Sequence, residues 1–295
     1  MVNSESDDIF ETLLESAKRL SFDSRDSNLC QLEIGDNERH GMTPQWSPLF
    51  GTPIWNRLSE SECVQVTRSE VAHFLGVGIW LEVGLQVALL RAKHSADPAR
   101  SDVKFLFNEC ADENLHSLMF ANAVKSIGSK FYPRDRMLDF FGFIFRHLAW
   151  GEVAHGIVLA GEEIFDVMQR DWMNSDNVAT PIRRAAYIHV VEESRHMMYA
   201  RQNIRQQLIG VSRLRRFIST LLIAAGTHVI AKSLINRRMY DALGLDWAVV
   251  KLDIDGNEHH RMMFRKAAGP FIEFLNKEGL LNLGARWIYR KSNLL

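Results

Sequence analysis

The sequence predicts an all-α protein built around a four-helix bundle with additional helices, and three observations support this. From Ser59 onward helical signals dominate, and no segment alternates with the two-residue period of strands. Apolar residues make up 46% of the 295 residues, which is enough for a sizeable core. The motif Glu-x-x-His occurs on two of the predicted helices, at residues 113–116 and 193–196. The rest of the chain is consistent with one helical unit.

The first part of the chain differs from the remainder. Residues 1–20 carry a short amphipathic pattern that predicts a surface-packed helix. Residues 21–56 are polar and irregular, with three prolines, and are expected to lie over the body as an extended arm. No composition break divides the residues after this arm. We therefore expect an N-terminal arm with a short helix over residues 1–56 and a single helical bundle domain over residues 57–295.

Caps and breakers place the first two bundle helices. One begins at Ser59 or Thr67 and ends near residue 94, because Pro98 follows. The second begins at a capping Ser101 and ends at Gly128. A third segment starts near residue 135, breaks near Gly142 or at residues 150–151, and continues to about residue 174.

The fourth helix begins at a capping Thr180, with Pro181 at the first helical position, and ends near residue 210. Ser212 is expected to cap an apolar helix over residues 214–243. Residues 253–258 resemble a calcium loop only superficially, because the twelfth position is not Glu, and are expected to form a turn. A last helix is predicted over residues 258–277, ahead of a tail.

Charge and composition exclude several classes of partner. Lys and Arg number 35 against 36 Asp and Glu, a net charge of −1, which argues against nucleic acid or an anionic membrane. The three cysteines lack metal-binding spacing and predict free thiols in a reducing compartment. The acidic first residues lack an apolar signal core. The apolar run at residues 71–90 carries Glu82 in its middle, so a buried helix is favoured over a membrane span. A cytoplasmic location is expected.

The strongest functional signal is a narrow stripe of imidazoles and a carboxylate. Each residue of a helix turns the chain by about 100°, which puts His189, Glu193 and His196 near 0°, 40° and −20°. A core face excludes such groups unless they are paired or bound to metal. Imidazole and carboxylate side chains three or four residues apart on one helix can bind the same transition metal ion. A satisfied polar cluster is the alternative for this stripe by itself.

Matching groups on other predicted helices favour the metal. Glu113 and His116 repeat the carboxylate–imidazole pair, and four-helix di-metal proteins combine two such pairs with one Glu from each remaining helix. Glu82 is the only carboxylate between residues 71 and 90, and is assigned as one of these. The alternative for Glu82 is a salt bridge to an arginine of another helix.

Helix level selects the last carboxylate. Glu82, Glu113 and Glu193 each lie 12 residues from the predicted end of their hairpin, roughly 18 Å along the helix, and Glu162 does as well. Glu152 lies about 15 Å off that level. Glu162 shares its face with apolar residues, so it is assigned, with Glu163 as the alternative.

The inferred set offers four carboxylates, which balance two divalent ions, and includes His189 as an extra imidazole. Carboxylate bridges with terminal imidazoles suit iron or manganese better than zinc. The sequence therefore predicts a site for two metal ions made by Glu82, Glu113, His116, Glu162, His189, Glu193 and His196.

Other polar residues are given structural roles. Glu109 stands four residues before Glu113, as His189 does before Glu193, but a solvated or salt-bridged role is favoured over one beside the site. Arg213, Arg215 and Arg216 are expected to form a solvated face.

With this set of residues, the chain resembles a known family. A single Glu, Glu-x-x-His, a single Glu and His-x-x-x-Glu-x-x-His resemble the p-aminobenzoate N-oxygenase family (AurF and CmlI), di-iron members of the ferritin-like superfamily, over roughly residues 59–235. The resemblance implies that the seven residues above bind two irons. It also implies a cytoplasmic, homodimeric monooxygenase of secondary metabolism that uses O₂ and an external donor of the ferredoxin or reductase type. Its substrate would be an arylamine, oxidised to hydroxylamine, nitroso and nitro products.

Two other functions share this pattern. One is a di-iron hydroxylase or desaturase that acts on carbon, against which the extra histidine argues. The other is a ferritin-like metal-binding protein without oxygenase activity, against which the asymmetric ligand set and the long additional helices argue.

Overall fold

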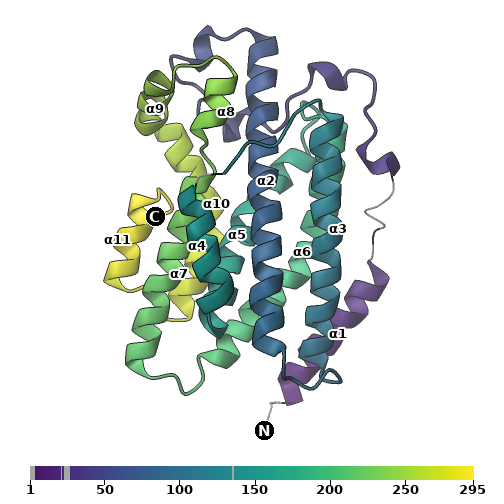
Figure 1. Ribbon diagram of the computed structural model, residues 1–295, viewed down its shortest axis with the longest axis vertical. Helices are drawn as coiled ribbons and strands as arrows, with labels where there is room; N and C mark the ends of the chain where they lie inside the picture. Colours follow the sequence, from purple (N-terminus) through teal and green to yellow (C-terminus); the bar gives the residue numbers. More distant parts are fainter. Residues whose placement is uncertain (1–3, 21, 23–26, 135) are drawn as a thin grey trace.

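The computed structural model describes residues 4–20, 22, 27–134 and 136–295, and its described elements are helical (Figure 1). Four long helices form the centre: α2 (Glu60–Lys93), α3 (Ser101–Ser126), α5 (Gly151–Met173) and α6 (Thr180–Gln207). Helix α3 lies beside α2 and α6, and α5 lies beside the same two helices. Short links join α2 to α3 and α5 to α6, so each pair is a hairpin. The prediction of an all-α, ferritin-like four-helix bundle with additional helices is confirmed.

The start of α2 agrees with the prediction, whereas the caps of α3 and α6 differ from it. Ser59 caps α2 with a complete capping box to Glu62, as one of the two predicted starts required. Ser101 is not a cap; it is the first residue of α3. Thr180 is also not a cap; it is the first residue of α6. Asp36 of the arm accepts hydrogen bonds from the backbone N of Thr180 at 3.0 Å and from its Oγ1 at 3.1 Å. A residue distant in sequence therefore caps α6.

The third segment breaks at the second of the two predicted positions. Two residues separate the end of helix α4 (Arg136–Leu148) from the start of α5 at Gly151. Gly142 does not break α4; its missing side chain leaves room for the ring of Trp80 on α2. Helix α4 thereby packs against α2 and also against α7 (Arg213–Ser233).

The C-terminal helices cover one side of the bundle (Figure 1). Ser212 caps α7 as predicted, but the predicted helix over residues 214–243 is two helices, because Asn236 caps a new one, α8 (Arg237–Ala242). The predicted turn at residues 253–258 is wrong: α9 (Trp247–Gly256) continues through Asp253, which accepts a hydrogen bond from Ile54 N. Helix α10 (Glu258–Lys277) confirms the last predicted helix and packs on α5, and α11 (Leu283–Lys291) packs on α7.

The N-terminal segment lies on the bundle. The predicted amphipathic helix is α1 (Ser4–Arg19), which packs across α3 and α6. From residue 27 onward the arm contacts the bundle through short 3₁₀ turns and passes very close to α2 at Gly41. A Cβ there would lie 2.5 Å from the Cα of Arg68, so only glycine allows this approach.

The polar centre of the bundle lies between two apolar clusters. On α2, Val77 belongs to one cluster and Leu85 to the other, with Glu82 between them. On α3, Met119 belongs to the first cluster and Cys110 to the second, and residues 113–116 lie between them. Such surroundings exclude water and strengthen electrostatic interactions within the layer.

Within the part of the chain that the structure describes, two stretches are long and apolar enough to cross a membrane by length and composition, α2 and residues 213–242. In the fold α2 is a core helix of the bundle, with 61% of its most apolar window buried against protein, compared with 39% for the second stretch. The burial of α2 agrees with the predicted core helix. The cytoplasmic location stays a prediction.

Candidate metal centre

The structure brings all seven predicted residues together in the middle of the bundle. They come from four helices and are between 0% and 5% exposed. Three sets of their ligand atoms lie mutually within 4.8 Å: Glu82 with His116 and His189, Glu113 with His116 and Glu193, and Glu162 with His189 and Glu193. Because these sets share members, they form one continuous cluster.

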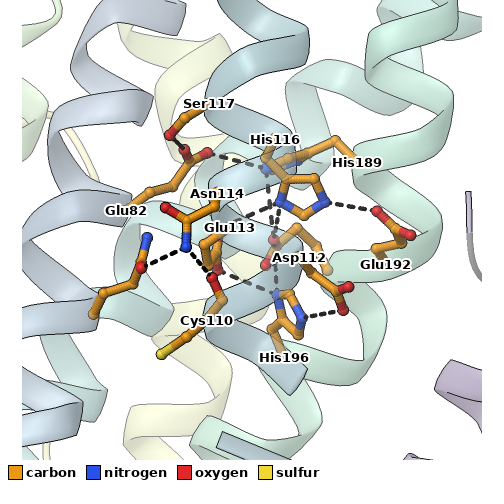
Figure 2. Close-up of polar contacts among 12 residues, drawn as sticks. Glu82, Cys110, Asp112, Glu113, Asn114, His116, Ser117, His189, Glu192 and His196 are labelled. Carbon is orange, nitrogen blue, oxygen red and sulfur yellow. Dashed lines mark hydrogen bonds and ion pairs between the residues drawn. The ribbon is translucent and has the colours of Figure 1, made fainter. Parts of the chain in front are cut away.

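The imidazoles present defined nitrogens to the carboxylates (Figure 2). His116 Nδ1 lies 3.2 Å from Glu113 Oε2 and 3.4 Å from Glu193 Oε1. His196 Nδ1 lies 3.0 Å from Glu193 Oε1 and 3.3 Å from Glu113 Oε1. The two Glu-x-x-His motifs therefore interlock across the α3–α6 contact, each histidine reaching the glutamate of both helices.

His189 approaches from a different side with its other nitrogen. Its Nε2 lies 3.6 Å from Glu193 Oε1 and 3.9 Å from Glu82 Oε1. Its ring centroid is 4.7 Å from that of His116. The additional imidazole thus lies beside Glu82 and His116.

Glu82 has no arginine partner among the described residues, which removes the alternative of an interhelical salt bridge. Instead Ser117 Oγ donates a hydrogen bond to Glu82 Oε2 at 2.6 Å (Figure 2). The serine belongs to α3 and leaves the other oxygen of the carboxylate directed at the cluster, 3.9 Å from His189.

The three candidate glutamates of α5 have different partners. Glu163 is ion-paired with Arg201 at 2.6 Å, and Glu152 with Arg215 at 2.8 Å. Glu162 alone faces the cluster, and its buried Oε2 has no hydrogen-bond partner in the described chain. Glu162 is therefore the candidate of α5 whose carboxylate lies beside His189 and Glu193, and its role as a ligand stays a prediction. Arg215, expected on a solvated face, is exposed and also forms an ion pair with the buried Glu152.

Three side chains that sequence reasoning missed hold the outer nitrogens of the histidines. Glu192 Oε2 lies 2.8 Å from His116 Nε2, Asp112 Oδ2 lies 3.4 Å from His196 Nε2, and Gln169 Oε1 lies 2.7 Å from His189 Nδ1. When the inner nitrogen binds a metal, the outer N–H donates to such an acceptor and fixes the ring. Two of these three acceptors could have been found in the sequence, because Asp112 and Glu192 each directly precede the Glu of a Glu-x-x-His motif.

The electrostatics of the cluster fit bound cations. Burial, and then the charge of Glu113, raise the pKa of Glu82 well above its usual value. Burial and the charge of Glu193 raise the pKa of Glu162 in the same way. One oxygen each of Glu162 and Glu193 is buried without a hydrogen-bond partner in the described chain. Crowded buried carboxylates have to be neutralised by protons or by bound cations, and two metal ions would neutralise all of them together. The oxygen and imidazole donors suit iron or manganese.

Glu109 differs from the expectation of a solvated or salt-bridged role. It is 2% exposed and forms no salt bridge with Lys or Arg among the described residues, and one of its oxygens lies within 4.8 Å of ligand atoms of Glu113 and His196. Its position four residues before Glu113 already placed Glu109 on the same face of the helix as Glu113, but this spacing did not show that Glu109 is buried.

Comparisons with known proteins identify the family of this chain. The family model described as p-aminobenzoate N-oxygenase AurF matches residues 3–279. An uncharacterised protein of Mycobacterium tuberculosis is 26% identical over 287 residues, and one of Mycobacterium bovis is 23% identical over the same length. Each alignment covers 95% of this chain and 84% of the relative. The match to the family model extends over nearly the whole chain, so the protein belongs to the p-aminobenzoate N-oxygenase AurF family.

Proposed function

We propose that this protein is a non-haem di-iron N-oxygenase that oxidises an amine, most fittingly an aromatic one. The observation that carries the proposal is the convergence of four glutamates and three histidines from α2, α3, α5 and α6 in one buried cluster. The proposed ligands are Glu82, Glu113, His116, Glu162, His189, Glu193 and His196.

Two irons held there would activate O₂, so that each oxygenation of an amine to a hydroxylamine consumes one O₂, two electrons and two protons and releases one water. The electrons would come from an external ferredoxin or reductase. The protein's own contribution is to bind and orient. His116 and His196 would bind through Nδ1 and His189 through Nε2, because these nitrogens face the carboxylates.

The extra imidazole supports an N-oxygenase over a six-ligand di-iron hydroxylase, because His189 completes the pattern by which the chain resembles the N-oxygenase family. His189 would be a seventh ligand, and a neutral nitrogen donor raises the electron density of the metal that it binds. Gln169 keeps the ring in place from behind.

An apolar cavity beside the bundle supports an aromatic substrate. It has a volume of about 400 Å³, is open to solvent on one side and is lined by residues of α2, α4, α5 and α7, among them Trp80, Leu81 and Phe145. None of its described lining residues is charged. Leu81 directly precedes the proposed ligand Glu82 on α2, and none of the seven proposed ligands lines the cavity itself. Apolar and aromatic walls of this kind suit an uncharged aromatic ring.

Filling this cavity tests its role. Leu222 lines it from α7, and Leu222→Trp is expected to raise KM for an aromatic amine without changing metal content. Leu214→Trp is the matched control, because Leu214 is on the same helix but is 69% exposed and does not line the cavity. Equal KM values for the two variants would exclude the cavity as the substrate site.

The function itself is tested with iron-loaded protein, a chemical reductant, O₂ and a panel of arylamines. An N-oxygenase yields hydroxylamine or nitro product that carries an oxygen atom from isotope-labelled O₂. A storage protein yields ferric iron only, and a hydroxylase places the label on carbon. Arylamines returned unchanged by protein that contains two irons would overturn the proposal.

A further inference from the structure

Helices α3 and α6 carry the same arrangement of groups, with one difference. In each, an acidic residue is followed by Glu-x-x-His, and another polar group precedes the glutamate by four residues. On α6 this group is His189, which faces Glu82 and His116. On α3 it is Glu109, which faces Glu113 and His196. The two groups therefore occupy corresponding positions at opposite ends of the cluster.

Glu109 is placed as a ligand would be. One of its oxygens, one oxygen of Glu113 and one ring nitrogen of His196 lie mutually within 4.8 Å. The side chain is 2% exposed, and its Oε2 is buried without a hydrogen-bond partner in the described chain. The charged groups that face it are His196 and the carboxylates of Glu113, Glu193 and Asp112. It is therefore a buried acid among other acids.

Three buried acids outside the cluster each have a partner on at least one carboxylate oxygen, although the second oxygen of Glu70 and of Glu163 has none in the described chain. Glu163 has Arg201, and Glu152 has Arg215. Glu70 accepts hydrogen bonds from the hydroxyls of Tyr240 and Ser47. Burying a carboxylate without such a partner is costly. Among the described residues, no lysine or arginine forms an ion pair with Glu109, so the partner that its position lacks is a cation.

We propose that Glu109 is an eighth protein ligand, which binds the metal ion shared by Glu113 and His196. The proposal rests on the di-metal centre proposed above and adds a fifth carboxylate to it. The two metal positions would then be chemically unequal, with an extra nitrogen donor from His189 at one and an extra oxygen donor from Glu109 at the other.

The fifth carboxylate changes the charge of the centre. Four carboxylates neutralise two divalent ions, whereas five neutralise one divalent and one trivalent ion. An added negative charge beside one ion stabilises its higher oxidation state. Glu109 is therefore expected to lower the reduction potential of the ion on the His196 side.

The test measures metal binding by purified apo-protein, independently of turnover. Co²⁺ is titrated anaerobically into the wild type, Glu109→Gln and Glu109→Met, and visible absorption reports the ligands of each ion. Wild type is expected to bind two ions. Both variants are expected to bind one ion as before and the other at least tenfold more weakly, with an altered spectrum. Glu163→Gln is the matched control, because it removes a buried carboxylate of the bundle that has an arginine partner.

A redox titration of the iron-loaded proteins gives a second readout, in which Glu109→Gln should have a higher midpoint potential than the wild type and Glu163→Gln should not. Crystals of the iron-loaded wild type should place an oxygen of Glu109 at bonding distance from one ion. Unchanged Co²⁺ affinities, spectra and potentials in both Glu109 variants would overturn the role of Glu109 while leaving the metal centre intact. A wild type that binds no Co²⁺ or iron would instead overturn the centre itself.

Discussion

Glu192 of α6 accepts a hydrogen bond at 2.8 Å from Nε2 of His116, which belongs to α3. The reverse arrangement holds on the other side, where Asp112 of α3 lies 3.4 Å from Nε2 of His196 of α6. Each helix thus orients the imidazole of the other. The orientation of the two rings is consequently a property of the α3–α6 contact and not of either helix.

Removing one of these acceptors should weaken metal binding without removing a ligand. Glu192→Ala leaves His116 free to rotate, and we expect the affinity for one of two Co²⁺ or Fe²⁺ ions to fall by roughly 10- to 100-fold in a calorimetric titration. Ser194→Ala, at an exposed position of the same helix, is the control and should match the wild type. An affinity for Glu192→Ala within twofold of the wild type would contradict this role.

The two adjacent glutamates of α5 should give opposite phenotypes. Glu162→Ala is expected to lose bound iron, because its carboxylate faces the cluster and has no protein partner on Oε2. Glu163→Ala is expected to keep both irons but to lower the free energy of unfolding by about 1 to 3 kcal/mol, because Arg201 loses its charged acceptor. Metal analysis and urea denaturation of both variants decide the assignment, and iron loss on changing Glu163 would reverse it.

Glu70, far along α2 from the metal centre, should make stability depend on pH. Burial raises its pKa from 4.5 to about 8. The folded state therefore holds a proton that the unfolded chain releases above a pH of about 4.5. This contribution is complete at lower pH and is lost as the pH rises through about 8, at about 1.4 kcal/mol per pH unit.

The variant Glu70→Gln isolates this effect, because the amide cannot ionise and other groups cancel in the difference from the wild type. Its free energy of unfolding relative to the wild type should rise steadily between about pH 5 and pH 8, measured by urea denaturation. A difference that does not change with pH would show that Glu70 titrates at its ordinary value.

Bound metal should stabilise the fold. The unfolded chain does not hold the ligands together, so Fe²⁺ at 100 times its dissociation constant should add about 2.7 kcal/mol to the free energy of unfolding. Anaerobic denaturation with Fe²⁺ and with chelator measures this. Glu113→Ala lacks a carboxylate that both Glu-x-x-His histidines contact and should show a smaller shift. Coincident curves for the wild type with and without iron would count against a metal site.

The bundle and most of the cluster could be predicted because helical periodicity is local. The separation of His189, Glu193 and His196 by four and three residues puts them on one face in any helix. Equal distances from the hairpin ends place Glu82 and Glu162 at the same level. The same reasoning could not decide between Glu162 and Glu163 with certainty, because that choice depends on Arg201, a residue of another helix.

The amino-acid sequence by itself determined the all-α class, the long helices and which side chains share a face, because these depend on interactions among residues three or four apart. Only the tertiary structure decided which groups meet across helices. It set Glu192 against His116, capped α6 with Asp36 and buried Glu109 beside His196. Burial and partners depend on packing between segments that are distant in the chain, and no local pattern encodes them.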